Sequence, residues 1–334
     1  MTRLLVLGGS SFVGRALVED GVGRGWDVTT FNRGLRDWAH PDAEHLHGDR
    51  LRPDDLAPLA ARDWDVVADT WSGAPRAARD SATALAPRAA RYLYVSSGSV
   101  YAPPPPVDGD EDAPTVDASP DAETTDYPAD KRGAELAIGE AFGDRAVFAR
   151  AGLILGPHED VGRLPAWLLR MDRGGEVLAP GPPDRPLQYV DARDLAAWLL
   201  DCAANDRSGP FNVVSRSGAA TMRTLLEACR DAVGTDAMFT WVDEPFVAEQ
   251  GIEPWTELPC WLPRDDEYAG MLATGVERAH GAGLRIRPLA ETVGDTWAWL
   301  LSVDKQPALR DDLPPHGLAP AKERAALAAW HSRR

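Results

Sequence analysis

A phenol and an ammonium stand four residues apart in the segment Tyr127-Pro128-Ala129-Asp130-Lys131. In a helix, this spacing places both side chains on one face. The positive charge then stabilises a phenolate, so the tyrosine can exchange a proton with a substrate alcohol or carbonyl. With six tyrosines and three lysines in 334 residues, chance would supply roughly 0.05 such pairs. The pair therefore predicts acid–base chemistry, with an exposed helical Tyr/Lys pair as the structural alternative.

Serine hydroxyls follow a predicted strand upstream of this pair, in the segment Ser96-Ser97-Gly98-Ser99. Ligands of α/β proteins collect at the carboxyl ends of parallel strands. A hydroxyl at such an end can donate a hydrogen bond to a substrate oxygen as charge develops there. We predict Ser97 as the catalytic serine and Ser99 as its rival, while turn formation is the alternative role for both.

A glycine-rich turn joins the first predicted strand to the first predicted helix. Its sequence is Gly8-Gly9-Ser10-Ser11-Phe12-Val13-Gly14. Backbone N–H groups of such a turn and the helix N-terminus bind the pyrophosphate of a dinucleotide. The predicted cofactor contacts are therefore Gly8, Ser10, Ser11, Phe12, Val13 and Gly14. Ser11 stands where the common fingerprint has its second glycine, and an ordinary strand-to-helix turn is the alternative.

The residues after the next two strands bear on the choice of cofactor. Enzymes that prefer NAD usually carry an acidic residue after the second strand, whereas this chain has Asn32 and Arg33. Arg33 can pair with a 2′-phosphate through its planar fork of donors, with a solvated loop arginine as the alternative. We therefore expect NADP(H), with NAD(H) as the second option. Asp49 is placed either to bind the adenine amine or to form a turn. Asn32 and Arg50 are further candidate cofactor contacts.

The elements that must position these residues alternate between strand and helix. Short apolar runs at residues 4–7, 27–31, 65–69, 92–96 and 146–149 alternate with helical stretches such as residues 13–21 and 76–90. This alternation predicts an α/β protein with a Rossmann-type, doubly wound parallel sheet. We expect a dinucleotide-binding domain over residues 1–155, with residues 185–215 returning to it. A smaller, partly interleaved substrate domain takes residues 156–184 and 216–304, and a tail with a short helix takes 305–334.

Residues 103–126, which begin with four prolines and are rich in acidic side chains, are expected to form an irregular surface loop.

Composition excludes several classes of protein. The net charge of −17 disfavours a nucleic-acid partner, because Lys and Arg supply most phosphate contacts. No apolar run approaches the roughly 20 residues of a membrane span. Three widely spaced cysteines fit reduced thiols in a cytoplasmic protein. His45 and His47 lack a third ligand, so no metal site is expected.

Together, these motifs resemble the extended or atypical short-chain dehydrogenase/reductase superfamily, in particular its NAD-dependent epimerase/dehydratase branch. The glycine turn, the serines before Val100-Tyr101 and the Tyr127/Lys131 pair carry the resemblance, which covers about the first 200 residues. It implies that Ser97, Tyr127 and Lys131 are catalytic and that Lys131 also binds the nicotinamide ribose. It also implies cofactor contacts from Thr70, Trp71, Ser96 and Ile154, and a homodimer through two helices is common in the branch.

The predicted function is hydride transfer between a nicotinamide cofactor and a secondary alcohol or ketone, with Tyr127 as acid and base. Reduction and epimerisation of a small hydroxylated or sugar-like substrate share this first step. Ser99, His158 and Trp255 are the candidate substrate contacts. The alternatives are a non-catalytic nucleotide- or RNA-binding protein on the same fold, and a cofactor sensor or scaffold. The net charge and the complete Ser/Tyr/Lys set argue against the first alternative, and the presence of Tyr127 argues against the second.

Overall fold

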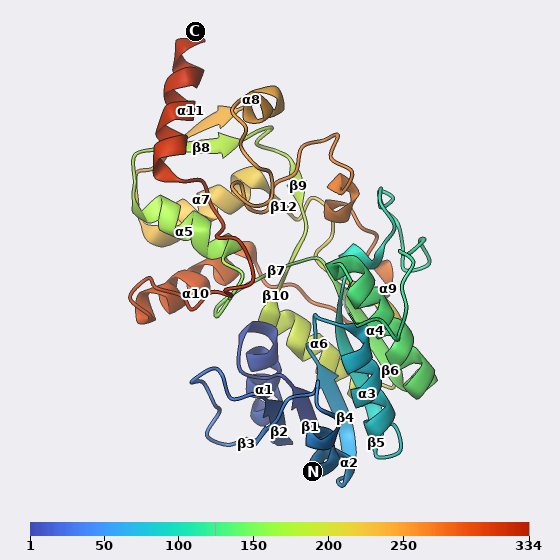
Figure 1. Cartoon of the computed structure of the whole chain (residues 1–334). Helices are drawn as coiled ribbons and strands as arrows, with labels where there is room; N and C mark the ends of the chain where they lie inside the picture. Colours follow the sequence, from blue (N-terminus) through green and yellow to red (C-terminus); the bar gives the residue numbers. More distant parts are fainter. Residues whose placement is uncertain (124, 334) are drawn as a thin grey trace. The chain divides into compact units, whose positions relative to one another are not determined.

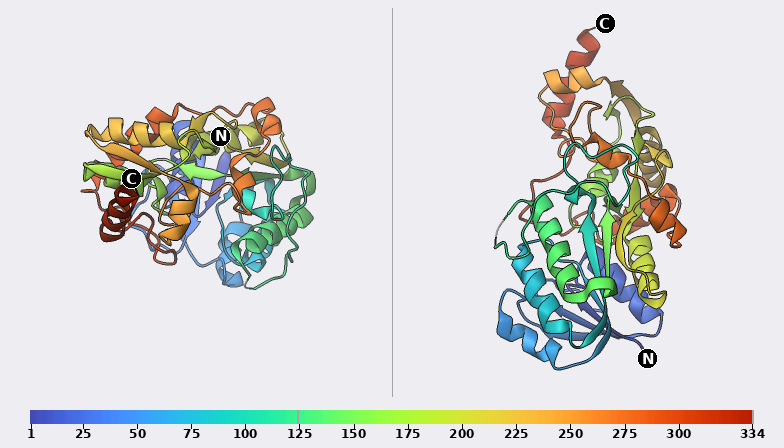
Figure 2. Two further views of the ribbon diagram at one scale, coloured as in Figure 1. Left: turned by 90° about the horizontal axis from the view of Figure 1, so that it is seen from above. Right: turned by 90° about the vertical axis from the view of Figure 1, so that its right-hand side faces the viewer.

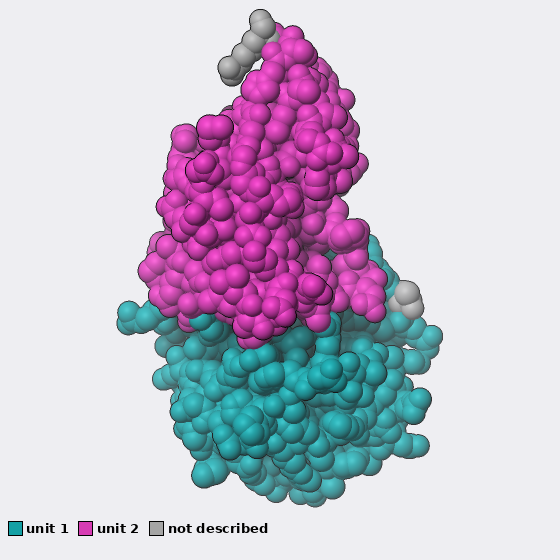
Figure 3. All heavy atoms as spheres, turned by 90° about the vertical axis from the view of Figure 1, so that its left-hand side faces the viewer, with its two compact units in different colours: residues 1–152, 192–214, 274–285 teal, residues 153–191, 215–273, 286–334 magenta. Residues whose placement is uncertain are grey.

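The computed structural model describes residues 1–123 and 125–333. The chain divides into two compact units, which Figure 3 colours separately. Unit 1 comprises residues 1–152, 192–214 and 274–285, and unit 2 comprises residues 153–191, 215–273 and 286–334. Each unit is therefore built from three separate stretches of the chain.

A seven-stranded parallel sheet forms the centre of unit 1 (Figure 1). Its strand order is β11-β6-β5-β4-β1-β2-β3, and every neighbouring pair is parallel. The strands are β1 (Arg3–Leu7), β2 (Asp27–Asn32), β3 (Glu44–His47), β4 (Trp64–Asp69), β5 (Ala89–Ser97), β6 (Ala146–Ala151) and β11 (Gly209–Val213). The prediction of a Rossmann-type, doubly wound sheet is confirmed.

Helices cover both faces of this sheet (Figure 2). On one face lie α3 (Pro75–Leu85) and α4 (Tyr127–Phe142), and on the other lie α1 (Phe12–Gly23) and α6 (Ala192–Ala204). Apolar side chains of α3 and α4 pack against β1, β4 and β5 and are almost fully removed from water: Ala78, Ala82, Leu85, Ala134, Ile138, Leu5, Val67 and Tyr92. Burial of this kind supplies most of the free energy that holds such layers together.

Two local predictions need correction. The helix expected over residues 76–90 ends at Leu85, and β5 begins at Ala89. Pro87 explains this early end, because a proline has no N–H to continue the helical hydrogen bonds and its ring clashes with the preceding turn. The acidic loop is also not wholly on the surface, since Glu111 is buried. Its carboxylate accepts a hydrogen bond from the backbone N–H of Asn212 at 2.7 Å and pairs with Arg278 at 3.3 Å.

Unit 2 contains three two-stranded sheets and several helices around its own core. The sheets pair β7 (Leu153–Leu155) with β10 (Tyr189–Asp191), β8 (Glu176–Pro180) with β13 (Met238–Val242), and β9 (Pro186–Leu187) with β12 (Ala220–Thr221). The main helices are α5 (Arg163–Asp172), α7 (Met222–Val233), α8 (Glu244–Glu249), α10 (Leu289–Ser302) and α11 (Pro320–Ser332). The helix α11 is anchored by a buried ion pair between Glu323 and Arg170 of α5.

The strand order of unit 1 reverses between β1 and β4, because β2 and β3 extend from β1 in one direction while β5, β6 and β11 extend from β4 in the other. In open α/β sheets, ligands bind at the carboxyl ends of the strands at such a reversal point. The glycine turn follows β1, and Thr70 and Trp71 follow β4. The topology therefore brings most of the predicted cofactor residues of unit 1 to one edge of the sheet.

Candidate active site

The turn after β1 is too tight for side chains at its glycines. Gly8 and Gly9 have φ of +118° and +92°, values that L side chains rarely adopt. A Cβ on Gly14 would lie 2.7 Å from the backbone nitrogen of Gly9, so α1 can approach the turn only without one. Ser11 is the N-cap residue of α1, and the first turn of this helix carries no acidic side chain.

Side chains from β2 and β4 hold this turn from two sides. Asn32 donates from its amide to the carbonyl of Gly8 at 3.1 Å and accepts the N–H of Gly34 at 2.8 Å. The Thr70 hydroxyl donates to the carbonyl of Leu7 at 3.2 Å. Both residues were predicted as cofactor contacts, and here both contact the backbone of the predicted phosphate turn or its flanks.

A dinucleotide fits the residues present at this edge. A Cβ on Gly8 would lie 2.4 Å from the Thr70 hydroxyl oxygen, so the turn and the end of β4 approach each other only because that position is glycine. A turn of this kind leaves backbone N–H groups for a pyrophosphate, and α1 adds the positive end of its dipole. Ser10 is half-buried and Val13 is buried, while Phe12 begins the helix with φ of +40°.

The two positively charged candidates at this edge differ sharply. Arg33 is exposed and has no hydrogen-bond or ion-pair partner among the described residues. Arg50 is buried and forms a bidentate ion pair with Asp69, with N···O distances of 2.6 and 2.8 Å. Asp49 accepts the N–H of Leu51 at 3.0 Å, which is the geometry of an Asx turn. Arg33 is thus the arginine left available to a ligand.

The catalytic pair stands at the start of α4. Asp126 caps this helix by accepting the N–H of Ala129 at 2.9 Å, and Pro128 occupies its second position. These signals begin the helix at Tyr127, a residue that is 47% exposed. One turn later Lys131 is only 3% exposed, and its ammonium nitrogen lies 6.0 Å from the centroid of the Tyr127 ring. The structure therefore places an accessible phenol beside a buried cation.

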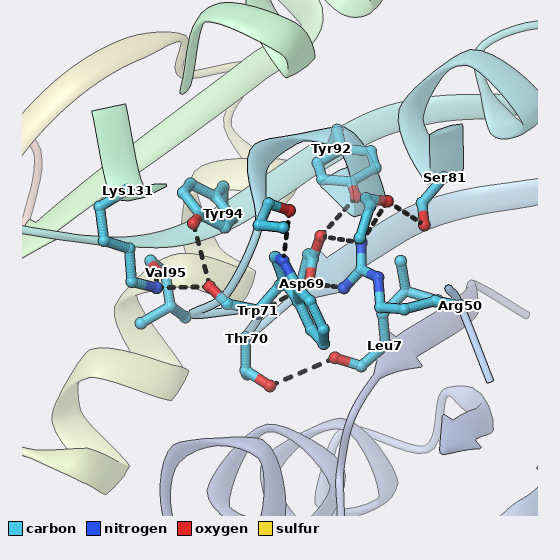
Figure 4. Close-up of polar contacts among 12 residues, drawn as sticks. Leu7, Arg50, Asp69, Thr70, Trp71, Ser81, Tyr92, Tyr94, Val95 and Lys131 are labelled. Carbon is cyan, nitrogen blue, oxygen red and sulfur yellow. Dashed lines mark hydrogen bonds and ion pairs between the residues drawn. The ribbon is translucent and has the colours of Figure 1, made fainter. Parts of the chain in front are cut away.

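Carbonyl oxygens from two strand ends hold the ammonium group (Figure 4). Lys131 donates from Nζ to the carbonyl of Trp71 at 2.5 Å and to that of Val95 at 2.7 Å. The ammonium also lies 4.8 Å from the centroid of the Tyr94 ring. These contacts tie α4 to the ends of β4 and β5.

The serines at the end of β5 have different partners. Ser97, which is 8% exposed, accepts the N–H of Ser99 at 3.1 Å and donates to the Ser99 hydroxyl at 3.2 Å. Ser96 instead donates to the buried carboxylate of Glu135 at 2.7 Å. Val95, which holds Lys131, and Ser97 are two residues apart on the same strand. The geometry thus favours Ser97 over Ser96 as a group that a ligand can reach.

The buried carboxylate of Asp69, which is connected to Lys131 through the backbone of Trp71, was not predicted from the sequence. Asp69 closes β4, is fully buried, and accepts hydrogen bonds from Arg50, from the Tyr92 hydroxyl at 2.6 Å and from the N–H of Trp71 at 2.9 Å. Burial alone would raise the pKa of Asp69, but the ion pair with Arg50 leaves it below its ordinary value. An aspartate that ends an otherwise apolar strand was the available sequence signal.

The remaining predicted residues belong to unit 2. Ile154 lies in β7, in register with Val190 of β10. His158 has φ of +65° and its ring centroid is 5.2 Å from that of Trp299. Trp255 has φ of +62°, and the guanidinium carbon of Arg163 lies 5.2 Å from its ring centroid. The cofactor and substrate roles of these three residues stay predictions.

No helix within residues 1–123 and 125–333 is long and apolar enough to cross a membrane. The same residues contain no group of three or more His, Cys, Asp or Glu side chains that could hold a metal ion.

Comparison with known proteins decides the family. Residues 4–215 match the model of the NAD dependent epimerase/dehydratase family. The chain belongs to this family. The expectation of an NAD(P)-dependent enzyme is thereby confirmed at the level of the family, while no protein of curated function matches the sequence.

Solved structures of epimerases share the fold of this family member at low sequence identity. A candidate epimerase of Burkholderia cenocepacia has a TM-score of 0.69 and 23% identity, covering 91% of this chain and 98% of its own. WbmH of Bordetella bronchiseptica, solved with NAD+, has a TM-score of 0.68 and 16% identity, covering 90% of this chain and 98% of its own. The UDP-N-acetylglucosamine 4-epimerase of Methanobrevibacter ruminantium was solved with UDP-N-acetylmuramic acid. It has a TM-score of 0.67 and 18% identity, covering 90% of this chain and 99% of its own.

Proposed function

We propose that this protein catalyses reversible hydride transfer between a nicotinamide cofactor and a secondary alcohol or ketone of a small hydroxylated, sugar-like substrate. The net reaction is a reduction or an epimerisation. One observation carries the proposal: the half-exposed phenol of Tyr127 lies one helical turn from an ammonium that is itself buried and held by two carbonyls. The sugar-like substrate is supported by structural neighbours whose names describe them as nucleotide-sugar epimerases.

The side chains divide the proton chemistry between them. Tyr127 takes the proton of the substrate hydroxyl during oxidation and returns it during reduction. Lys131 stabilises the phenolate form through its fixed positive charge. Ser97 donates its hydroxyl hydrogen to the substrate oxygen, a role for which Ser99, its hydrogen-bond partner, is the rival. When bound, the nicotinamide cofactor supplies and accepts the hydride.

The cofactor proposal assigns roles to the residues around the glycine turn. Backbone N–H groups near Ser10, Ser11 and Phe12 would bind the pyrophosphate at the start of α1. Arg33 would pair with a 2′-phosphate, which makes NADP(H) the preferred form. Support comes from the exposed, unpaired state of Arg33 among the described residues and from Asn32, an amide where NAD-preferring enzymes place a carboxylate.

Purified protein tests this function in two steps. Titration with NADPH and with NADH, followed by cofactor fluorescence, should show binding of both and tighter binding of NADPH. Ketones and nucleotide sugars are then screened, with cofactor oxidation as the readout of reduction and nuclear magnetic resonance as the readout of epimerisation.

The variant Tyr127→Phe should bind the cofactor normally and lose turnover by about 10²–10⁴-fold. Equal turnover in this variant would overturn the proposal. Salt-dependent RNA binding without any cofactor binding would instead support the alternative of a non-catalytic protein.

A further inference from the structure

The carboxylate of Asp69 is connected to Lys131 through the backbone of Trp71, and each of its oxygens accepts two hydrogen bonds. Arg50 occupies both oxygens, Tyr92 donates to one of them, and the Trp71 N–H donates to the other (Figure 4). The residue is fully buried. A buried carboxylate costs several kcal/mol unless it is paired and hydrogen-bonded, so each of these contacts has a structural reason. One of them, however, leads directly to the catalytic pair.

The peptide units of Trp71 connect Asp69 to Lys131. The N–H of Trp71 is fixed by Asp69, and its carbonyl accepts Lys131 Nζ at 2.5 Å and the Tyr94 hydroxyl at 3.0 Å. Its indole N–H donates to the carbonyl of Ala74 at 2.9 Å, and the Arg50 guanidinium carbon lies 4.9 Å from the indole centroid. Every polar atom of Trp71 therefore has a partner, and the direction of its carbonyl is set from both ends.

Two buried carboxylates of this region, Asp69 and Glu135, are each paired with an arginine. Arg50 cancels the charge of Asp69, and on α4 itself Glu135 is paired with Arg150 at 3.0 Å. Burial raises the pKa of Tyr92 and of Tyr94 well above 10, so both remain neutral phenols. Carbonyl dipoles and aromatic rings thus hold Lys131, while the charges of Asp69 and Glu135 are balanced by partners of their own.

We propose that Asp69 is a positioning residue for Lys131. Its carboxylate fixes the Trp71 backbone so that the Trp71 carbonyl holds the ammonium. Arg50 neutralises that carboxylate, which leaves the field of the ammonium to act on Tyr127. The proposal rests on the function proposed above, and it extends the active site to two buried residues, Asp69 and Arg50.

The first test measures the pH at which Tyr127 ionises in the full-length protein, with no substrate needed. Tyrosinate absorbance is recorded for each variant and for the same variant carrying Tyr127→Phe, and the difference isolates Tyr127. Asp69→Asn leaves Arg50 unbalanced and should lower this pH by at least about 0.5 unit, whereas Arg50→Met leaves Asp69 unbalanced and should raise it by a similar amount. No shift, or shifts in the same direction, would overturn the role of charge balance.

The second test avoids unbalanced buried charge, which can prevent folding of the single variants. Arg50→Met/Asp69→Asn keeps an oxygen that accepts the Trp71 N–H, while Arg50→Met/Asp69→Leu has the same branched shape, with two methyl groups in place of the amide, and lacks that acceptor. Tyr127 should ionise at a pH at least about 0.5 unit higher in the Leu variant than in the Asn variant. Turnover should also be at least about tenfold lower in the Leu variant. Identical values in the two double variants would overturn the positioning role.

A matched control comes from the buried ion pair of unit 2. Arg170→Met/Glu323→Gln removes the same kinds of charge from a pair bonded at 2.7 Å, and it should leave the ionisation of Tyr127 unchanged. Failure of this proposal is distinguishable from failure of the proposed function. If Tyr127→Phe abolishes turnover but the Asp69 variants behave alike, only the positioning role is wrong. If Tyr127→Phe retains turnover, the function itself is wrong.

Discussion

The ammonium of Lys131 lies one helical turn from the Tyr127 ring, 6.0 Å from its centroid, and donates to two carbonyl oxygens from different strand ends. These peptide dipoles, together with the neighbouring aromatic rings, hold a charged side chain that is only 3% exposed. A buried cation held in this way keeps a strong field at short range, because the surrounding medium screens it poorly.

Replacing Lys131 should therefore abolish catalysis and leave the fold intact. Lys131→Met takes away the charge that stabilises the Tyr127 phenolate and should lower kcat by about 10²–10⁴-fold. It should also raise the pH at which Tyr127 ionises, measured by tyrosinate absorbance. Lys305→Met is the matched control, since Lys305 is a half-exposed lysine of unit 2 paired with Asp172. A Lys131 variant that kept full turnover would contradict the assignment of the pair.

Two glycines of α1, Gly14 and Gly23, should respond differently to an added methyl group. In Gly14→Ala the new Cβ would lie 2.7 Å from the nitrogen of Gly9, so the turn must shift. We expect a loss of about 1–3 kcal/mol of stability and weaker NADPH binding. At Gly23, the last residue of the same helix, a new Cβ would point into open space, with no packing neighbour within 4 Å. Gly23→Ala should be neutral or gain up to about 1 kcal/mol. Thermal unfolding and NADPH titration of both variants test this prediction. Equal NADPH affinities of Gly14→Ala and Gly23→Ala would contradict the assignment of this turn as the phosphate site.

Cofactor choice should depend on Arg33. Arg33→Ala should weaken NADPH binding by roughly tenfold, through loss of one charge-assisted contact to the 2′-phosphate, and should change NADH binding little. Arg88→Ala is the control, because Arg88 is an exposed arginine immediately before β5, at the opposite edge of the sheet. Equal losses for NADPH and NADH in Arg33→Ala would show that this residue does not read the 2′-phosphate.

Unit 2 should lose stability as the pH rises from about 4.5 to about 7. Burial raises the pKa of Glu159 to about 7, although its carboxylate accepts the N–H groups of Arg163 and Leu164 at 2.6 and 3.2 Å. The folded chain binds this proton more tightly than the unfolded chain, whose value is 4.5. The stabilisation is thus complete below pH 4.5 and is lost as the pH rises to about 7, by up to about 3 kcal/mol.

Glu159→Gln cannot titrate, so its free energy of unfolding should lack this contribution. Relative to the wild-type chain, the variant should gain stability between pH 4.5 and 7, as measured by denaturant unfolding at several pH values. A constant difference between the two proteins across that range would show that Glu159 does not titrate there.

Local features of the site were predictable because local sequence causes them. The glycine turn follows from steric limits on φ within seven residues, and the start of α4 follows from Asp126 and Pro128, its cap and its second residue. The Tyr127/Lys131 pair follows from helical periodicity alone. The alternation of apolar strands and helices likewise predicts the parallel sheet, since each element must bury one side.

Partners distant in sequence were not predictable. Arg50, a candidate cofactor contact, forms an ion pair with Asp69, which lies 19 residues away at the end of β4, a strand that is not next to β3 in the sheet. Glu111, in a loop expected to be solvated, pairs with Arg278, which joins unit 1 from the far end of the chain. Each of these partners depends on strand order and on which segments return to the sheet.

By itself, then, the sequence determined the class of fold, the turn that suits a dinucleotide and the spacing of the phenol and ammonium, because all three arise from interactions between near neighbours in the chain. Tertiary structure alone decided that Lys131 is buried against the carbonyls of Trp71 and Val95, and that Asp69, paired with Arg50, accepts the N–H of Trp71. The physical reason is that burial and charge pairing belong to groups brought together by packing of the whole sheet, whose order no short stretch of sequence encodes.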